Sequence, residues 1–132
     1  MTLVHISLKT GRAPQLGGQI GQRVHRAITE VLDVAAANRF QIVTEQGAEL
    51  INDAPLENER ANAAVIVLIY LTGRYSDRKK RALFGRIGAM LDSELGIASR
   101  DVVVGVIDAP AQNWTFGYDE TQFRQMLAYQ LP

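Results

Sequence analysis

Stretches of apolar residues divide the chain into two halves with the same order of elements. Residues 64–71 are eight consecutive apolar residues rich in Val and Ile, and residues 102–107 form a second apolar run. A half-exposed strand would alternate apolar and polar residues, so unbroken runs are typical of strands buried on both faces. The pattern predicts two buried strands in the second half of the chain.

The first half shows alternation followed by a helical spacing. Residues 2–8 place apolar side chains on alternate positions, which predicts a strand. Apolar residues then recur every three or four positions across residues 16–32, the spacing of one apolar stripe on a long helix. Residues 40–43 predict a further short strand, and residues 47–62 a connecting loop.

A second helix is expected between the two buried strands. Ser76 is suited to cap its first turn, and Gly96 to end it in the left-handed conformation. Its apolar stripe consists of Leu83, Ile87, Met90, Leu91 and Leu95.

The two halves are related as an internal repeat. Thr-Gly-Arg follows the first strand at residues 10–12 and recurs after the third strand at residues 72–74, each time ahead of an amphipathic helix. A chance tripeptide is the alternative, but the registers of the strands and helices agree as well. We therefore predict an α/β (α+β) fold of two β-α-β repeats, forming a four-stranded mixed sheet with two helices on one face. The chain is expected to be a single domain, 1–132, with repeats at 2–62 and 63–117 and a tail at 118–132.

This architecture leaves one face of the sheet without cover. Two helices, each about 10 Å across, cover one face of four strands spaced about 4.8 Å apart, and nothing remains for the other face. Because the third and fourth strands are apolar on both sides, we expect that face to contact other copies of the chain in a closed homo-oligomer.

Composition excludes several functional classes. The formal net charge is zero, which argues against nucleic-acid binding driven by overall charge. The absence of cysteine and the presence of two histidines argue against a thiolate or histidine-rich metal site, and we expect no cofactor. No apolar run reaches the length of a membrane span, and no signal sequence is evident, so a cytoplasmic protein without membrane partners is expected.

Several short motifs resemble those of the tautomerase superfamily, and most of all its malonate semialdehyde decarboxylase group. The most specific are Asn-Arg-Phe-Gln at residues 38–41 and Asn-Trp-Thr-Phe-Gly at residues 113–117, together with Gly-Arg at residues 73–74. The similarity runs from Thr2 to about Phe123. It implies a β-α-β repeat fold, a homotrimer whose sheets face inward, and a pocket at the amino end of the first strand.

Two positions depart from the catalytic pattern that the resemblance implies. The family uses an amino-terminal proline freed by removal of the initiator methionine, whereas Thr2 follows Met1 here. If Met1 is removed, Thr2 carries a primary amine with a reference pKa of about 7.7–8.0, which still permits base or Schiff-base chemistry. The family's aspartate is replaced by Asn38, whose amide donates a hydrogen bond but takes no proton at neutral pH. A turn residue without a part in catalysis is the alternative for Asn38.

Further positions match the residues that hold a carboxylate or wall the pocket. Arg39 and Arg74 are candidates for binding a carboxylate, with a surface salt bridge and a solvated side chain as the respective alternatives. Where the family often reads Gly-Arg-Ser or has two arginines separated by one residue, this sequence has one arginine and an inserted Tyr75. Tyr75 is a candidate to close the pocket or to donate a hydrogen bond. Trp114 and Phe116 match an apolar pocket wall, although ordinary core or interface aromatics would look the same.

Two functional hypotheses follow. In the first, the protein is a keto-enol tautomerase or decarboxylase-like enzyme acting on a small carbonyl compound that bears a carboxylate. In the second, it is a catalytically inactive trimeric homologue that serves as a small-carboxylate binding or interaction protein. Fold alone does not separate them, since related folds host different chemistries.

Overall fold

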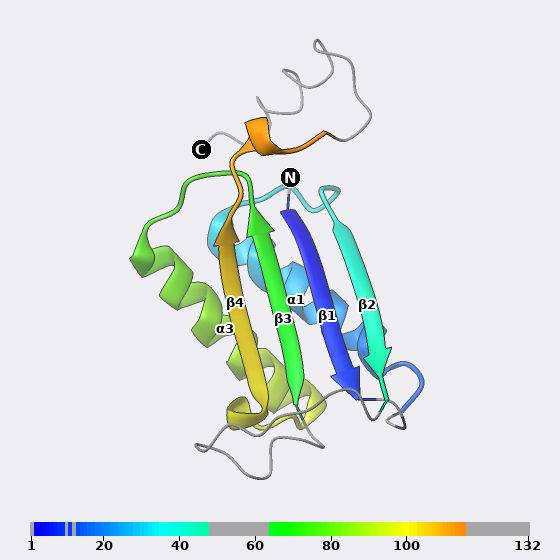
Figure 1. The fold of residues 1–132 in the computed structure, drawn as a ribbon. Helices are drawn as coiled ribbons and strands as arrows, with labels where there is room; N and C mark the ends of the chain where they lie inside the picture. Colours follow the sequence, from blue (N-terminus) through cyan, green and yellow to red (C-terminus); the bar gives the residue numbers. More distant parts are fainter. Residues whose placement is uncertain (1, 10, 12, 48–63, 116–132) are drawn as a thin grey trace, which may run out of the picture.

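The computed structural model describes residues 2–9, 11, 13–47 and 64–115 (Figure 1). Two short 3-10 helices accompany the main helices and strands. The elements in chain order are β1 (Thr2–Lys9), α1 (Leu16–Leu32), β2 (Phe40–Gln46), β3 (Val65–Leu71), α3 (Asp77–Leu95), η1 (Ser99–Asp101), β4 (Val102–Asp108) and η2 (Ala111–Asn113). The four strands and the two long helices predicted from the sequence are present, and β2 extends three residues beyond the predicted short strand.

The four strands form one mixed sheet in the order β2-β1-β3-β4. β1 runs parallel to β2, β3 runs parallel to β4, and the two units meet antiparallel at β1 and β3. As a result, the first residues of β1 and β2 and the last residues of β3 and β4 lie at the same end of the sheet. We call this end, which carries Thr2, Phe40, Leu71 and Asp108, the site end.

Both helices lie on one face of the sheet, as the repeat predicted (Figure 1). Their apolar stripes form the core with alternate residues of β1 and β3. The buried core residues on the helices include Ile20, Val24, Ala27, Ile28 and Leu32 of α1, and Leu83, Ile87, Met90 and Leu91 of α3. The helical stripes that suggested the repeat are therefore the surfaces that bury the core.

The helix ends follow the local sequence. The Ser76 side chain accepts a hydrogen bond from the backbone N–H of Lys79, and Gly96 ends α3 with φ at 68°. Both confirm the predicted caps. In α1 no side chain caps the start at Gln15, and Asp33 takes the left-handed conformation at the end, with φ at 58°.

The face of the sheet away from the helices is open in the single chain. Along β1 and β3, buried side chains toward the helices alternate with half-buried ones on the open face. Rows of partners across the open face include Phe40, Leu3, Tyr70 and Ile107 at the site end. Phe40 is 51% exposed and Ile107 37% exposed, so this face carries apolar side chains in contact with solvent.

A small polar cluster interrupts the apolar character of the open face. The His5 Nε2 lies 3.0 Å from the Thr44 Oγ1 and 3.5 Å from the Ser7 Oγ. His5 is therefore held by hydroxyl groups of its own strand and of β2.

Candidate functional site

Thr2 lies at the start of β1 and is nearly inaccessible to solvent. The residue is 4% exposed, and it pairs with Leu71 at the end of β3. The Leu71 carbonyl accepts a hydrogen bond of 2.8 Å from the backbone N–H of Ala109, which ties the segment after β4 to the same place. The beginning of β1 is thus enclosed by the segments that follow β3 and β4.

An aromatic pair stands on the open face of the site end. The rings of Tyr70 and Trp114 contact each other edge to face, with centroids 6.0 Å apart and an interplanar angle of 77°. The Trp114 Nε1 donates a 3.0 Å hydrogen bond to the Ala109 carbonyl, which fixes the indole. Trp114 was expected from the sequence, whereas Tyr70 was missed because it stands within an apolar run; its place opposite Leu3 depends on the pairing of the strands.

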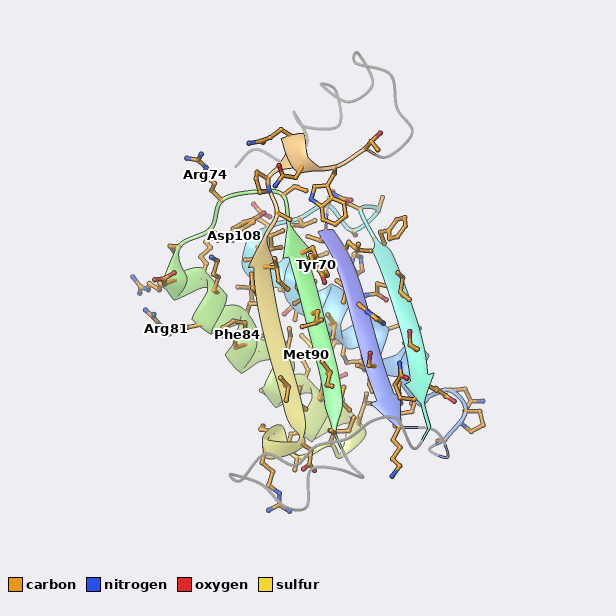
Figure 2. All side chains as sticks on the ribbon, in the orientation of Figure 1. Tyr70, Arg74, Arg81, Phe84, Met90 and Asp108 are labelled. Atoms are coloured by element: carbon orange, nitrogen blue, oxygen red, sulfur yellow. The ribbon has the colours of Figure 1, made fainter. Side chains whose placement is uncertain are left out.

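Arg74 projects from the loop between β3 and α3 (Figure 2). Its side chain is exposed and points away from the strands, and it makes no ion pair with the residues that the structure describes. Only the short Tyr75-Ser76 segment separates it from α3, whose first N–H groups favour negative charge nearby. A guanidinium at this position is available to a carboxylate that approaches the site end.

Tyr75 turns inward against the hydrophobic core. A Cβ placed on Gly73 would lie 3.1 Å from the Tyr75 Cε2, so the ring folds closely over the preceding backbone. Burial raises the pKa of the Tyr75 hydroxyl above its ordinary value of 10.0, and the negative charge of Asp33 raises it further. Tyr75 therefore packs against the core and does not project from the loop ahead of α3.

Asn38 and Arg39 lie ahead of β2, at the edge of the sheet. The Asn38 backbone N–H donates a 2.9 Å hydrogen bond to the Ala35 carbonyl in the turn after α1. The Arg39 guanidinium donates to the Gln41 Oε1 from both Nε and Nη2, at 3.0 and 2.8 Å. Gln41 in turn donates to the Gly21 carbonyl at 2.9 Å, so Arg39 is held on the helix side of β2.

The structure thus brings some of the predicted site residues together and separates others. Thr2 and Trp114 share the site end with Tyr70, and Arg74 lies at its rim. Arg39 precedes β2 at the edge of the sheet, where its guanidinium is bonded to Gln41. Phe116 lies outside the described residues.

The model of the family described as "Tautomerase enzyme" matches residues 38–117. This chain belongs to the tautomerase family. This tautomerase is 30% identical over 125 residues to the probable tautomerase YrdN of Bacillus subtilis (strain 168), a match that covers 93% of this chain and 96% of YrdN.

Solved structures agree with this assignment. The crystal structure of FG41 malonate semialdehyde decarboxylase inhibited by 3-bromopropiolate is 28% identical, with a TM-score of 0.82 over 95% of this tautomerase and 96% of that chain. A fused 4-OT asymmetric trimer has the same fold, with a TM-score of 0.74 at 17% identity, over 91% and 96% of the two chains. The predicted resemblance to the malonate semialdehyde decarboxylase group is confirmed.

The described residues of this tautomerase contain neither a cluster of metal-ligating side chains nor a helix that could span a membrane. Residues 2–9, 11, 13–47 and 64–115 contain no group of three or more His, Cys, Asp or Glu side chains placed to hold a metal ion. Neither α1 nor α3 has the length and apolar character needed to cross a membrane.

Proposed function

We propose that the protein catalyses keto-enol tautomerisation of a small carbonyl compound that bears a carboxylate. The amino group of Thr2, freed by removal of Met1, serves as the base. The observation that supports this proposal is the enclosed start of β1, where Thr2 lies at the same end as the Tyr70–Trp114 pair. Tyr70 and Trp114 give this end of the sheet an apolar surface, and Arg74 lies at its rim.

The reaction requires one group that carries a proton. The neutral amine takes a proton from the carbon next to the carbonyl, and the electron pair of that C–H bond moves to form the enolate. The resulting ammonium returns the proton to the enolate oxygen, so atoms and charge balance with no co-reactant. A free α-amine, with a reference pKa of about 7.7–8.0, is partly neutral at physiological pH and suits this task.

The substrate class follows from the groups around the amine. Arg74 is our candidate for the carboxylate, because a guanidinium forms charge-assisted hydrogen bonds with both carboxylate oxygens. Tyr70 and Trp114 offer an apolar wall for the rest of the substrate. We prefer tautomerisation to decarboxylation because Asn38, in place of an aspartate, cannot exchange a proton at neutral pH.

We further propose that the active form is a homotrimer. The open face carries exposed apolar side chains on both edge strands, including Phe40, Ile42, Val103 and Ile107. Patches of this kind mark contacts with other proteins. A trimer is the assembly of the fused 4-OT protein that shares the fold.

The proposal is tested with two preparations of the protein, one without Met1 and one that retains it, each identified by intact mass spectrometry. Both preparations are assayed with the enol form of phenylpyruvate. We expect activity in the Met1-free form and at least 10-fold less with Met1 retained. Arg74→Ala should lower kcat/KM by about 10- to 100-fold, since hydrogen bonds to charged groups contribute about 1.5–3 kcal/mol. Arg78→Ala, an equal loss of charge at an exposed position in the first turn of α3, is the matched control. Equal activity of the two forms would overturn the assignment of the base.

A catalytically inactive carboxylate-binding protein is the second candidate. It is favoured by the two altered positions, a threonine at the amino terminus and an amide at Asn38. In that case the protein would bind phenylpyruvate in an Arg74-dependent manner without converting it. Thr2→Pro separates the two candidates, because activity gained by this variant alone would show that the surrounding groups suffice and that only the base had been lost.

A further inference from the structure

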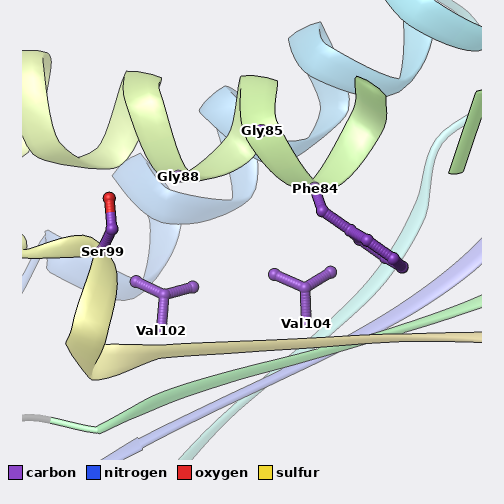
Figure 3. A pocket seen from close by; sticks show the side chains of 6 residues that line it. All are labelled: Phe84, Gly85, Gly88, Ser99, Val102 and Val104. Atoms are coloured by element: carbon purple, nitrogen blue, oxygen red, sulfur yellow. The ribbon is translucent and has the colours of Figure 1, made fainter. Parts of the chain in front are cut away.

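The cavity between α3 and β4 and the site end offer different chemistry to a small molecule. The cavity has a volume of about 360 Å³ and is lined by Phe84, Gly85, Gly88, Ser99, Val102 and Val104 (Figure 3). None of these six residues carries a charge, and Ser99 supplies their one side-chain hydroxyl. A reaction that develops negative charge on an oxygen therefore finds more suitable partners at the site end.

Tyr70 carries its hydroxyl on the open face of the site end (Figure 2). Its neighbours Ile69 and Leu71 are buried toward the helices, so the half-buried side chain of Tyr70 projects to the opposite side of the sheet. Tyr70 pairs with Leu3, the residue after Thr2. Because paired residues of antiparallel strands have Cα atoms about 4.5–5.5 Å apart, Tyr70 stands one residue away from the amine that we assign as the base.

The ring of Tyr70 is held by its surroundings. The indole of Trp114 contacts it edge to face, with centroids 6.0 Å apart, and Leu3 and Ile107 are its partners on the two neighbouring strands. The indole itself is fixed by its hydrogen bond to the Ala109 carbonyl. A donor that is fixed before the substrate arrives needs no reorganisation during the reaction, and apolar neighbours strengthen the hydrogen bond that it makes.

The hydroxyl of Tyr70 is available to a ligand. Within residues 2–9, 11, 13–47 and 64–115 it has no hydrogen-bond partner. Other donors at the site end are engaged: the Trp114 Nε1 binds the Ala109 carbonyl, and the Lys80 Nζ lies 3.0 Å from the Asp108 Oδ2. Because a half-buried hydroxyl gains free energy from a partner, an oxygen atom of a bound molecule is favoured beside Tyr70.

We propose that Tyr70 is a further catalytic residue, whose hydroxyl donates a hydrogen bond to the keto oxygen of a bound 2-oxo acid. The inference rests on the tautomerisation proposed above and names the group that stabilises its enolate. Negative charge moves onto the keto oxygen when the Thr2 amine takes the proton from carbon, so the hydrogen bond becomes charge-assisted in the transition state. The phenol keeps its own proton, and the bonds that form and break are those already given.

The first test removes the hydroxyl and keeps the ring. In Met1-free protein, Tyr70→Phe should lower kcat for the enol form of phenylpyruvate by about 100-fold, as expected for the loss of one donor to an oxyanion. KM should be unchanged, because the interaction is realised in the transition state. Ser7→Ala removes a hydroxyl from the same face near the opposite end of β1, and this matched control should retain the wild-type kcat.

The fluorescence of Trp114 shows whether the ring of Tyr70 still supports the indole. Tyr70→Phe preserves the edge-to-face contact, so the emission maximum and its quenching by acrylamide should equal those of the wild type. Tyr70→Leu removes the contact and should change both. A lower kcat in Tyr70→Phe together with altered emission would overturn the inference, since loss of ring support would then explain the effect. A change in KM alone would overturn it as well.

The second test needs no turnover. Oxalate presents one carboxylate and, on the adjoining carbon, a second negatively charged oxygen that stands in for the enolate oxygen, whereas acetate presents a carboxylate alone. Titrations followed by Trp114 fluorescence should show the dissociation constant of oxalate raised by about 10-fold in Tyr70→Phe, as expected for one hydrogen bond to a charged group. The dissociation constant of acetate should be unchanged.

The outcomes separate this inference from the proposed function. An active wild type whose kcat is unaffected by Tyr70→Phe overturns the role of Tyr70 and preserves the tautomerisation. An inactive wild type whose affinity for oxalate depends on Tyr70 overturns the tautomerisation and preserves the contact between the hydroxyl and the ligand. Equal affinity of the wild type and Tyr70→Phe for oxalate overturns that contact.

Discussion

The two β-α-β units share one plan but differ in how closely the helix approaches its edge strand. In the first unit, Gly17 and Gly21 of α1 let the helix lie against β2, with Val43 and Gln41 in contact with the helix backbone. In the second unit, Gly85 and Gly88 of α3 lie over the cavity beside β4. Glycines therefore have different effects in the two helices. In α1 they allow close packing because β2 side chains fill the space beside them, whereas in α3 they line a cavity because the β4 side chains do not fill it.

The largest expected effect tests what the units have in common. Ile28 of α1 and Leu91 of α3 are both fully buried. Ile28→Ala and Leu91→Ala should each lower the free energy of unfolding by about 2–5 kcal/mol, measured by urea denaturation, because each removes several buried methylene groups. A loss below 1 kcal/mol in one variant would show that the core is not shared equally by the two units.

Glycine substitutions should distinguish the two helices. Gly17→Ala places a Cβ 2.6 Å from the Val43 Cγ1 and should destabilise the fold by about 1–3 kcal/mol, the usual cost of overpacking. Gly85→Ala has open space and should stabilise it by about 0.5–1 kcal/mol through better helix propensity. Thermal unfolding of the two variants checks this, and effects of the same sign would contradict the comparison.

The helix starts differ as well. Ser76→Ala removes the hydrogen bond that the Ser76 Oγ accepts from the Lys79 N–H at 3.2 Å, and should cost about 1 kcal/mol. Gln15→Ala is the matched change at α1, where no side-chain cap exists, and should have almost no effect. Urea titrations of both variants measure the difference, which would vanish if Ser76 did not act as a cap.

The smallest effect concerns Tyr75, which packs against the core just ahead of α3. Its pKa is raised in the folded state, so the folded protein holds this proton more tightly than the unfolded chain. The contribution of the protonated Tyr75 hydroxyl to the free energy of unfolding is therefore fully present below pH 10, and it is lost as the pH rises toward the folded-state pKa. Tyr75→Phe should match the wild type within about 0.5 kcal/mol at pH 7 and lose less stability between pH 9 and 11.

Much of the fold could be predicted from the sequence because it depends on local patterns. Short stretches of sequence were enough to predict the apolar stripes of α1 and α3, the Ser76 cap and the end of α3 at Gly96. The structure confirms all of these. The internal repeat correctly predicted a sheet of four strands with both helices on one face.

The candidate site was less predictable because it depends on how the strands pair. Tyr70 joins Trp114 only because β4 runs parallel to β3 and brings the segment after β4 to the end of β3. The inward turn of Tyr75 depends on packing that no motif encodes. The hydrogen bonds of Arg39 to Gln41 likewise require the β2 edge to be in place. The functional roles of the predicted site residues all stay predictions: Thr2, Asn38, Arg39, Arg74, Tyr75, Trp114 and Phe116.

The indole of Trp114 belongs to the single tryptophan of the sequence, and it stands beside Tyr70 where the proposed substrate would enter. Intrinsic fluorescence excited at the indole band therefore originates from this one place in each subunit. Quenching or a spectral shift on adding a carboxylate compound would report occupancy directly, without a label and even in the absence of turnover.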